Sequence, residues 1–364
     1  MSRYTPLTEL HEELGAWFTD FAGWSMPVRY GSEIAEHESV RERAGLFDLS
    51  HMGEIELTGP EAGASLDHAI VGHASKIGIG RARYSMLCAD DGGVLDDLVI
   101  YRLADDRYLV VANAGNAAVV AAALQDRAAG FDTSVRDTSD EWALIAVQGP
   151  AAAAIVERLT SVDLSALRYY AITTGSLTGC EVLLARTGYT GEDGFEVYCR
   201  PGDAARIWAA LTEAGSSDGL IPAGLACRDT LRLEAGMPLY GHELNPEVTP
   251  FEAGLGRLVA FDKPGDFVGR TALAQRRDEG ARQVLAGLAS AGRRAPRSGY
   301  TVIDPAGGVV GHVTSGAPSP TLGHPIAMAY VPVGLHEPGT KLLVDIRGKR
   351  EAVVVVPMPF YRRP

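Results

Sequence analysis

Residues 142–159 read WALIAVQGPAAAAIVERL, an apolar run that closes on Gly-Pro and continues as an alanine-rich segment. The apolar residues in succession favour a buried strand over 142–147. Proline is typical of the first turn of a helix, so Pro150 predicts that a helix follows over 151–159. A further helix is predicted over 204–214. Because helices and strands alternate irregularly along the chain, the sequence favours an α+β fold over a doubly wound parallel sheet.

From about residue 283 the pattern changes to short apolar runs separated by glycine and proline. Runs at this spacing are typical of a small all-β barrel or sandwich, which we expect as a separate C-terminal unit. The polar segment Arg276-Arg-Asp-Glu-Gly280 is the predicted linker in front of it. Strands are expected over 301–303, 309–314, 326–331, 342–346 and 352–356.

The composition is typical of a folded protein with two or three packed units, since 46% of the 364 residues are hydrophobic and 22% are charged. The formal net charge of −13 argues against a broad surface for DNA or RNA. The charge is uneven, because residues 263–364 hold 14 Lys and Arg against 7 Asp and Glu. This excess fits an acidic partner and an ordinary solvated surface equally well.

The spacing of the four cysteines and the absence of several enzyme motifs exclude further classes of protein. Cys88, Cys180, Cys199 and Cys227 lie far apart and have no neighbouring histidine, so we expect no metal site and no disulfide framework. We find no dinucleotide, P-loop, serine-hydrolase or zincin motif. The longest apolar run covers only 117–124, so we expect no membrane span and no export signal, and we place the protein in the cytoplasm.

Residues 90–101, DDGGVLDDLVIY, bring two adjacent carboxylates into a predicted strand. Because side chains alternate along a strand, Asp96 and Asp97 cannot both face solvent. The inward one is either a structural acid near a turn or a carboxylate suited to acid/base or charge-stabilising chemistry.

Two further segments carry polar residues that could bind a ligand. In the glycine-rich stretch 186–198, RTGYTGEDGFEVY, alternation places Glu196 on the face opposite Phe195, although a simple hairpin would explain the glycines equally well. In the predicted helix 223–236, Arg228 and Arg232 lie one turn apart. They form either an ion-pair ladder or a fork for a ligand carboxylate.

Taken together, these segments resemble the aminomethyltransferase family, the T proteins of the glycine cleavage system, over essentially the whole chain. The resemblance rests on the common order and spacing of many short stretches, each of which would be weak alone. They are 20–27 (DFAGWSMP), 45–53 (GLFDLSHMG), 84–85 (YS), 92–97 (GGVLDD), 147–150 (VQGP), 188–196, 227–236 (CRDTLRLEAG), 314–320 (TSGAPSP) and 358–360 (MPF).

The resemblance implies an α+β fold of three domains in a cloverleaf around a central folate-binding opening, with a C-terminal β-barrel-like domain. Residues 1–53 and 138–276 would form a discontinuous central folate-binding domain. Residues 54–137 would form an inserted α+β domain, and residues 277–364 the barrel.

The reaction implied is the transfer of a one-carbon unit from the aminomethyl-dihydrolipoyl arm of the H protein to tetrahydrofolate. Ammonia leaves, and methylene-tetrahydrofolate is formed without a metal. Two other members of the superfamily are alternatives, namely a folate-dependent demethylase and a folate-binding protein of iron-sulfur assembly. The first is disfavoured because no N-terminal dinucleotide fold is predicted, and the second because residues 262–270 contain no cysteine.

The resemblance also implies the site residues. Asp97 would be the catalytic carboxylate, either as a general base or as an electrostatic stabiliser of the cationic carbon. Arg228 would bind the anionic glutamyl end of folate, and His51 would be a structural histidine with satisfied hydrogen bonds. Arg257, where relatives commonly carry tryptophan, would stack on the ligand or attract a polyglutamyl tail. The other folate-binding residues would be Met52, Tyr84, Asn113, Tyr189 and Glu196, with Tyr361 and Arg362 closing the cleft.

Overall fold

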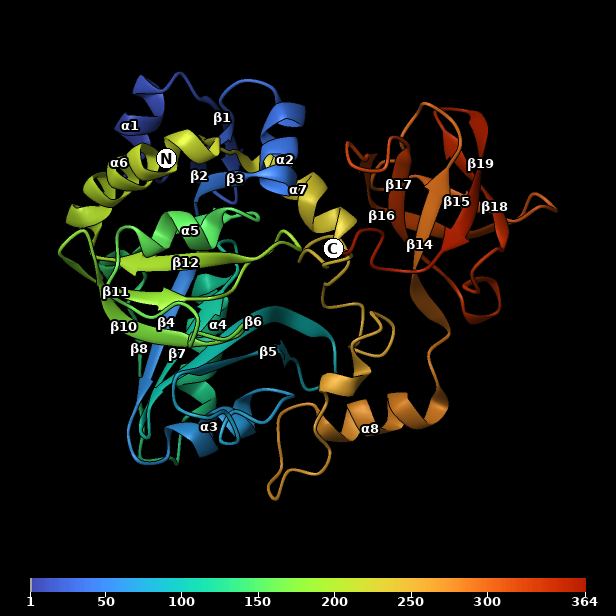
Figure 1. Ribbon diagram of the computed structural model, residues 1–364. Coiled ribbons are helices and arrows are strands. Elements are labelled where there is room, and N and C mark those ends of the chain that lie inside the picture. Colours follow the sequence, from blue (N-terminus) through green and yellow to red (C-terminus); the bar gives the residue numbers. More distant parts are fainter. Residues whose placement is uncertain (1) are drawn as a thin grey trace. The chain divides into compact units, whose positions relative to one another are not determined.

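The computed structural model describes residues 2–364, and the chain forms two compact units (Figure 1). The first contains the residues up to Ser85 together with Leu98–Arg228, and the second contains Met86–Asp97 together with Asp229–Pro364. Helices accompany mainly antiparallel strands along the chain, which confirms the α+β class. The division into three domains stays a prediction.

A six-stranded sheet with the order β10-β11-β12-β9-β3-β13 forms the centre of the first unit. Its neighbouring strands are antiparallel except for β3 and β13. Helices α5 (Ala152–Glu157) and α6 (Ala204–Gly215) lie against this sheet (Figure 1). The strands are β3 (Ala44–Asp48), β9 (Ala143–Gln148), β10 (Ile172–Leu177), β11 (Cys180–Ala185), β12 (Gly194–Cys199) and β13 (Leu220–Pro222).

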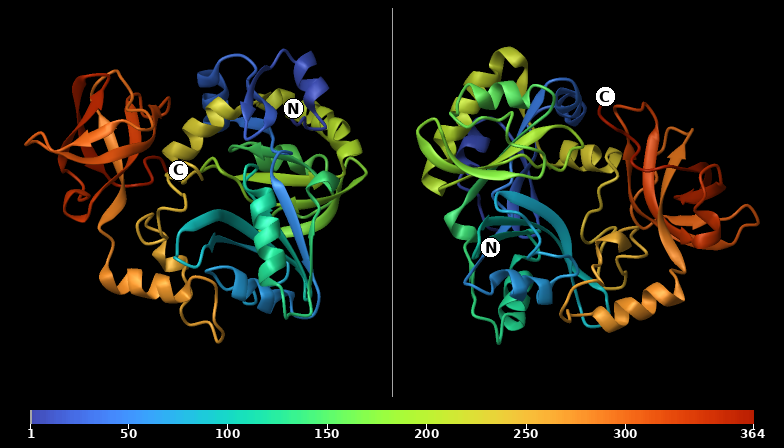
Figure 2. Two further views of the ribbon diagram at one scale, coloured as in Figure 1. Left: turned by 180° about the vertical axis from the view of Figure 1, so that it is seen from behind. Right: turned by 60° about the horizontal axis from the view of Figure 1, so that its bottom comes forward.

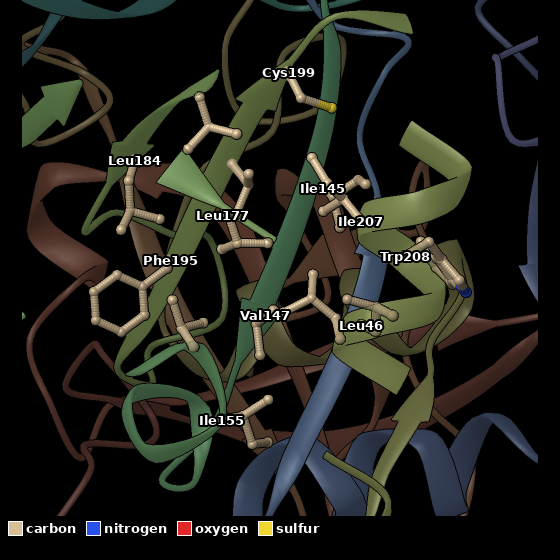
Figure 3. Packing of buried hydrophobic residues seen from close by; sticks show 14 of the residues in the cluster. Leu46, Ile145, Val147, Ile155, Leu177, Leu184, Phe195, Cys199, Ile207 and Trp208 are labelled. Atoms are coloured by element: carbon tan, nitrogen blue, oxygen red, sulfur yellow. The ribbon is translucent and has the colours of Figure 1, made fainter. Parts of the chain in front are cut away.

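The apolar core of the first unit lies between this sheet and helices α5 and α6 (Figure 3). Every residue of β9 is buried, which agrees with the continuous apolar run in its sequence. Ile155 of α5 and Trp208 of α6 join Val147 and Phe195 of the sheet in one cluster. Burying each such side chain stabilises the fold by about 1.5–3 kcal/mol.

A five-stranded sheet with the order β5-β6-β7-β4-β8 is paired by mainly antiparallel contacts. Helix α4 packs against one face of β4. Its first residue, Ala117, lies so close to Gly53 at the start of β4 that a Cβ added at Gly53 would be 2.5 Å from the Cβ of Ala117. Side chains alternate along β4, so Ile55 shares that face whereas Glu54 and Glu56 lie on the opposite one. The elements are β4 (Gly53–Thr58), α3 (Ala62–Ala69), β5 (Arg81–Cys88), β6 (Val94–Ala104), β7 (Arg107–Ala112), α4 (Ala117–Arg127) and β8 (Ser134–Asp137).

The remaining helices and strands before residue 235 are short and belong to neither of these two sheets. Strands β1 and β2 pair as an antiparallel hairpin, and the side chain of Ser32 caps α2 by accepting from the backbone N–H of Ala35 at 3.3 Å. The elements are α1 (Thr8–Glu13), β1 (Trp17–Phe21), β2 (Trp24–Arg29), α2 (Glu33–Glu42) and α7 (Leu225–Glu234).

The second unit contains a closed barrel with the strand order β14-β17-β16-β15-β18-β19 (Figure 2). This confirms the predicted C-terminal barrel, and β15 to β19 lie where the apolar runs place them. The sequence does not predict β14, because its residues QVLAGLAS include few of the β-branched types that favour strands. The strands are β14 (Gln283–Ser290), β15 (Thr301–Ile303), β16 (Val309–Pro318), β17 (Pro325–Pro332), β18 (Lys341–Ile346) and β19 (Lys349–Val356).

The predicted linker over 276–280 is mostly helical, because residues 276–279 form the last turn of helix α8 (Arg270–Glu279). Arg276 and Arg277 suit that position, since cations are favourable near the C-terminus of a helix. Gly280 ends the helix with φ of 77° and ψ of 150°, a positive-φ conformation that glycine adopts without strain.

Candidate active site

Glu196 stands on β12 with its carboxylate facing away from the main core of the first unit. Phe195 and Val197 on either side of it are fully buried in that core, as the alternation predicts. The Glu196 Oε2 atom accepts hydrogen bonds from the hydroxyl of Thr187 and from the hydroxyl of Tyr101, the latter at 3.3 Å. Burial raises the pKa of Glu196, whereas these two hydrogen bonds and the charge of Arg228 oppose the rise.

Tyr189, Glu196 and Arg228 line one small pocket in the first unit. The guanidinium carbon of Arg228 lies 4.7 Å from the centroid of the Tyr189 ring, within the range of a cation–π contact. The other lining residues are Phe47, Leu49, Ala146, Gln148 and Thr190. A carboxylate, an aromatic ring and a cation therefore meet in a partly apolar hollow, although 32 residues separate Glu196 from Arg228 in the sequence.

Gln148 explains the glycines of the loop in front of β12. Its amide nitrogen donates to the Thr187 carbonyl at 3.0 Å, and its amide oxygen accepts from the Thr190 hydroxyl at 2.9 Å. A Cβ added at Gly188 or Gly194 would lie 2.0 or 2.4 Å from atoms of the Gln148 side chain. Only glycine lets the loop close around this amide, and the spacing of the glycines does not by itself identify Gln148 as the residue that they enclose.

Tyr101 and Thr187 are two site residues that sequence reasoning misses, although both lie in segments it selected. Tyr101 is fully buried, and its hydroxyl lies 2.9 Å from the Thr187 hydroxyl. The signal for Tyr101 was alternation on β6, where it shares one strand face with Asp97. Nothing in the sequence indicates that its hydroxyl reaches Glu196, because the two residues belong to different sheets.

Asp96 and Asp97 on β6 point to opposite faces of the strand, as the alternation of side chains predicts. Asp96 is 0% exposed, so one of the two acids does face inward. Asp97 lies on the other face of the strand and is partly exposed. Burial alone would select Asp96, and the assignment of catalysis to Asp97 stays a prediction that rests on the family resemblance.

The other predicted residues do not line the pocket around Glu196. Tyr84 lies in β5 and Asn113 follows β7, both partly buried in the first unit. Met52 lies in the turn after β3, and its backbone N–H donates to the Leu49 carbonyl at 3.0 Å. In the second unit, the backbone N–H of Tyr361 donates to the Glu234 carbonyl at 2.8 Å, and Arg362 and Arg257 are exposed.

The expectation that His51 is a structural histidine with satisfied hydrogen bonds is wrong. The residue is 1% exposed, and neither ring nitrogen has a hydrogen-bond partner within residues 2–364. Its ring packs edge-on against Phe21 with centroids 5.5 Å apart. Burial, and then the charge of Arg228, lowers the pKa of His51 to about 3, although Asp48 acts in the opposite direction.

His51→Phe is therefore expected to make the protein less sensitive to acid. Below pH about 6.5 the unfolded chain binds a proton at this residue and the folded chain does not, so the wild type loses stability as the pH falls. Between pH 7.5 and pH 5.0 we expect the variant to gain about 2 kcal/mol of unfolding free energy relative to the wild type. Urea unfolding at the two pH values measures this, and a difference that does not change with pH would contradict it.

Two kinds of feature are absent from residues 2–364. No three His, Cys, Asp or Glu side chains in this range are grouped so that they could hold a metal ion. None of the helices in the same range has the length and apolar character needed to cross a bilayer.

Comparisons with known proteins agree over both units. Residues 7–263 match the GCVT N-terminal domain, and residues 283–362 match the glycine cleavage T-protein C-terminal barrel domain. An aminomethyltransferase of Saccharopolyspora erythraea is 60% identical over 361 residues, which cover 99% of this chain and 98% of the relative. An aminomethyltransferase of Bacillus subtilis is 45% identical over 364 residues, with both chains fully covered.

A solved structure extends the similarity to the fold. The crystal structure of glycine cleavage system aminomethyltransferase T from Bartonella henselae superposes with a TM-score of 0.94 at 38% identity, and the match covers 100% of this chain and 99% of that one. Sequence and fold thus agree along the whole length, and the chain belongs to the aminomethyltransferase family, the T proteins of glycine cleavage.

Proposed function

We propose that this protein transfers the one-carbon unit of an aminomethyl-dihydrolipoyl H protein to tetrahydrofolate in glycine cleavage. The carbon–sulfur bond and the carbon–amine bond break, and the carbon becomes bonded to two folate nitrogens. The two protons released from those nitrogens leave with the thiol and the ammonia. The observation that supports this most directly is the pocket in which Glu196, Tyr189 and Arg228 meet, within a chain that matches aminomethyltransferases over its full length.

Glu196 is the proposed partner of the pterin. A carboxylate accepts two hydrogen bonds in parallel, which suits the two donors on the edge of an amino-pyrimidine ring. The donors from Thr187 and Tyr101 favour the charged form of this carboxylate and hold it in place. The Tyr189 ring offers an aromatic surface, and Arg228 beside it suits the anionic end of the substrate.

Asp97 is the proposed catalytic carboxylate. A negative charge next to the reacting carbon would stabilise the iminium-like cation that forms when the bond to sulfur breaks. The same carboxylate would take up or deliver a proton as ammonia leaves. Its partly exposed position on β6, on the strand face shared with Tyr101, is compatible with contact to a ligand, whereas Asp96 is enclosed.

The remaining contacts are proposed from the family resemblance. Met52, Tyr84 and Asn113 would contact the folate, and Tyr361 with Arg362 would close the cleft. Tetrahydrofolate would be a co-substrate, and the lipoylated H protein would be the macromolecular partner. We also propose a cytoplasmic location and a chemistry that needs no metal.

A direct assay tests the function against its two alternatives. Purified protein is mixed with aminomethylated H protein and tetrahydrofolate, and ammonia and methylene-tetrahydrofolate are measured together. We expect equal amounts of both products, and no folate product when the H protein carries an unmodified lipoyl arm. Folate binding without turnover would favour the non-enzymatic alternative. Formation of methylene-tetrahydrofolate from a methylated amine and a flavin oxidase, with no use of the H protein, would favour the demethylase.

A further inference from the structure

Glu54 is a carboxyl that the proposed mechanism does not use, and its surroundings are unusual for an acid. It lies on β4, on the face turned away from α4, and is 1% exposed. Its Oε1 atom has no hydrogen-bond partner within the described residues 2–364. Leaving a charged carboxylate buried in this way costs several kcal/mol, whereas the neutral acid avoids most of that penalty.

Strand pairing through β7 places Glu54 of β4 and Tyr101 of β6 on the same face of the five-stranded sheet. Burial raises the pKa of the Tyr198 hydroxyl on β12, and the negative charges of Glu196 and Glu54 add to this rise. The Tyr198 hydroxyl lies 3.5 Å from the Tyr101 hydroxyl, which in turn donates to Glu196. The rings of Tyr101 and Tyr198 meet edge to face with centroids 6.0 Å apart. Glu54 therefore lies on the sheet face from which Tyr101 reaches Glu196.

The charges that act on Glu54 all disfavour a second negative charge. Burial is the largest cause that raises the pKa of Glu54, followed by the carboxyls of Asp137 on β8 and Glu196 on β12. Glu196 is better able to carry the charge, since it accepts two hydrogen bonds and lies near Arg228. When two carboxyls interact in a site of low dielectric constant, they lose their protons in two separate steps.

We propose that Glu54 is held as a neutral carboxylic acid behind Glu196, so that this pair carries a single negative charge in the folded protein. Glu54 is then a positioning residue, which acts through Glu196 and does not touch the substrate. The benefit of a neutral Glu54 for ligand binding rests on the proposed function, in which a singly charged Glu196 accepts hydrogen bonds from the edge of a pterin. The protonation of Glu54 itself does not depend on that function.

The test compares the pH dependence of stability for wild type and Glu54→Gln, a neutral side chain of similar shape. From pH 5 to pH 7 an unfolded glutamate is ionised and a neutral folded one is not, so rising pH favours unfolding of the wild type only. The ratio of the unfolding constants, wild type over variant, should rise about tenfold per pH unit, or about a hundredfold in total. A ratio that stays constant or falls would mean that Glu54 is ionised in the folded state and would overturn the proposal.

Glu56→Gln is the matched control. Glu56 lies two residues further along the same face of β4, where Arg107 and Arg136 pair with it. We expect no rise in the ratio for this variant, since an ion-paired carboxylate is not held neutral.

Infrared difference spectra at pH 7 give a second readout. A protonated carboxyl band should be lost in Glu54→Gln and kept in Glu56→Gln, and its presence in both variants would contradict the assignment. Neither readout uses folate, so failure of the transfer assay would leave this result unaffected.

Discussion

Asp97→Asn is expected to lower kcat by about 10²–10⁴-fold, the range in which a positioned acid or base contributes to catalysis. Asparagine keeps the shape of the side chain but removes the charge that would stabilise the cationic carbon and the oxygen that would accept a proton. Because Asp97 is only partly buried, the variant should fold normally. Single-turnover formation of methylene-tetrahydrofolate from aminomethylated H protein measures the effect, with circular dichroism to verify the fold.

Asp96→Asn is the matched control for this prediction, because the same chemical change is made one residue away. Asp96 is 0% exposed, so its replacement should act on stability more than on the reaction. We expect a far smaller loss of kcat and a lower urea midpoint. If Asp97→Asn keeps most of its turnover while Asp96→Asn loses it, the wrong carboxylate has been assigned.

Arg232→Met is expected to destabilise the second unit by about 3–5 kcal/mol, the usual cost of removing one partner of a buried ion pair. Arg232 is 1% exposed and lies 2.8 Å from an oxygen of Glu243, which is 0% exposed. The same guanidinium donates to Asp229 and to the hydroxyl of Ser315 on β16, each at 2.7 Å. Without the arginine, the Glu243 carboxylate stays buried without its cation. Urea unfolding measures the loss.

The double variant Arg232→Met with Glu243→Gln distinguishes the charge from the packing. Removing both charges leaves no uncompensated ion, so the double variant should be more stable than Arg232→Met alone. A loss below about 1 kcal/mol in the single variant would show that this network behaves like an exposed salt bridge. Such a small loss would also contradict the view that the ion pairs with Asp229 and Glu243 hold Arg232 away from a ligand, whereas Arg228 one turn earlier lines the pocket.

Local patterns in the sequence were sufficient for much of the secondary structure. The apolar run before Pro150 forms the buried strand β9, and the short runs after residue 300 form barrel strands. These elements are predictable because one face, or both faces, of each must be apolar to be buried. The choice between an ion-pair ladder and a ligand fork for Arg228 and Arg232 was open, and the structure separates them. Arg232 forms the ladder, and Arg228 lines the pocket.

Elements that depend on their neighbours were not predictable. Strand β14 forms because β17 and β19 pair with it on both sides, although its own residues favour strands only weakly. The segment 276–280 looks like a linker because it is polar, but its polar residues are the exposed end of helix α8. His51 was expected to have hydrogen-bond partners, and only the packing around it shows that its ring nitrogens have none.

The sequence by itself determined the family, the α+β class, the barrel, and which segments carry the chemistry, since these depend on residue order and on local alternation. Only the tertiary structure decided which side chains act together. Tyr101 reaches Glu196 from another sheet, Gln148 shapes the glycine loop, and Glu54 is buried on the same sheet face as Tyr101. The physical reason is that hydrogen bonds and the cost of burying charge depend on distances in space, which the order of residues along the chain does not specify.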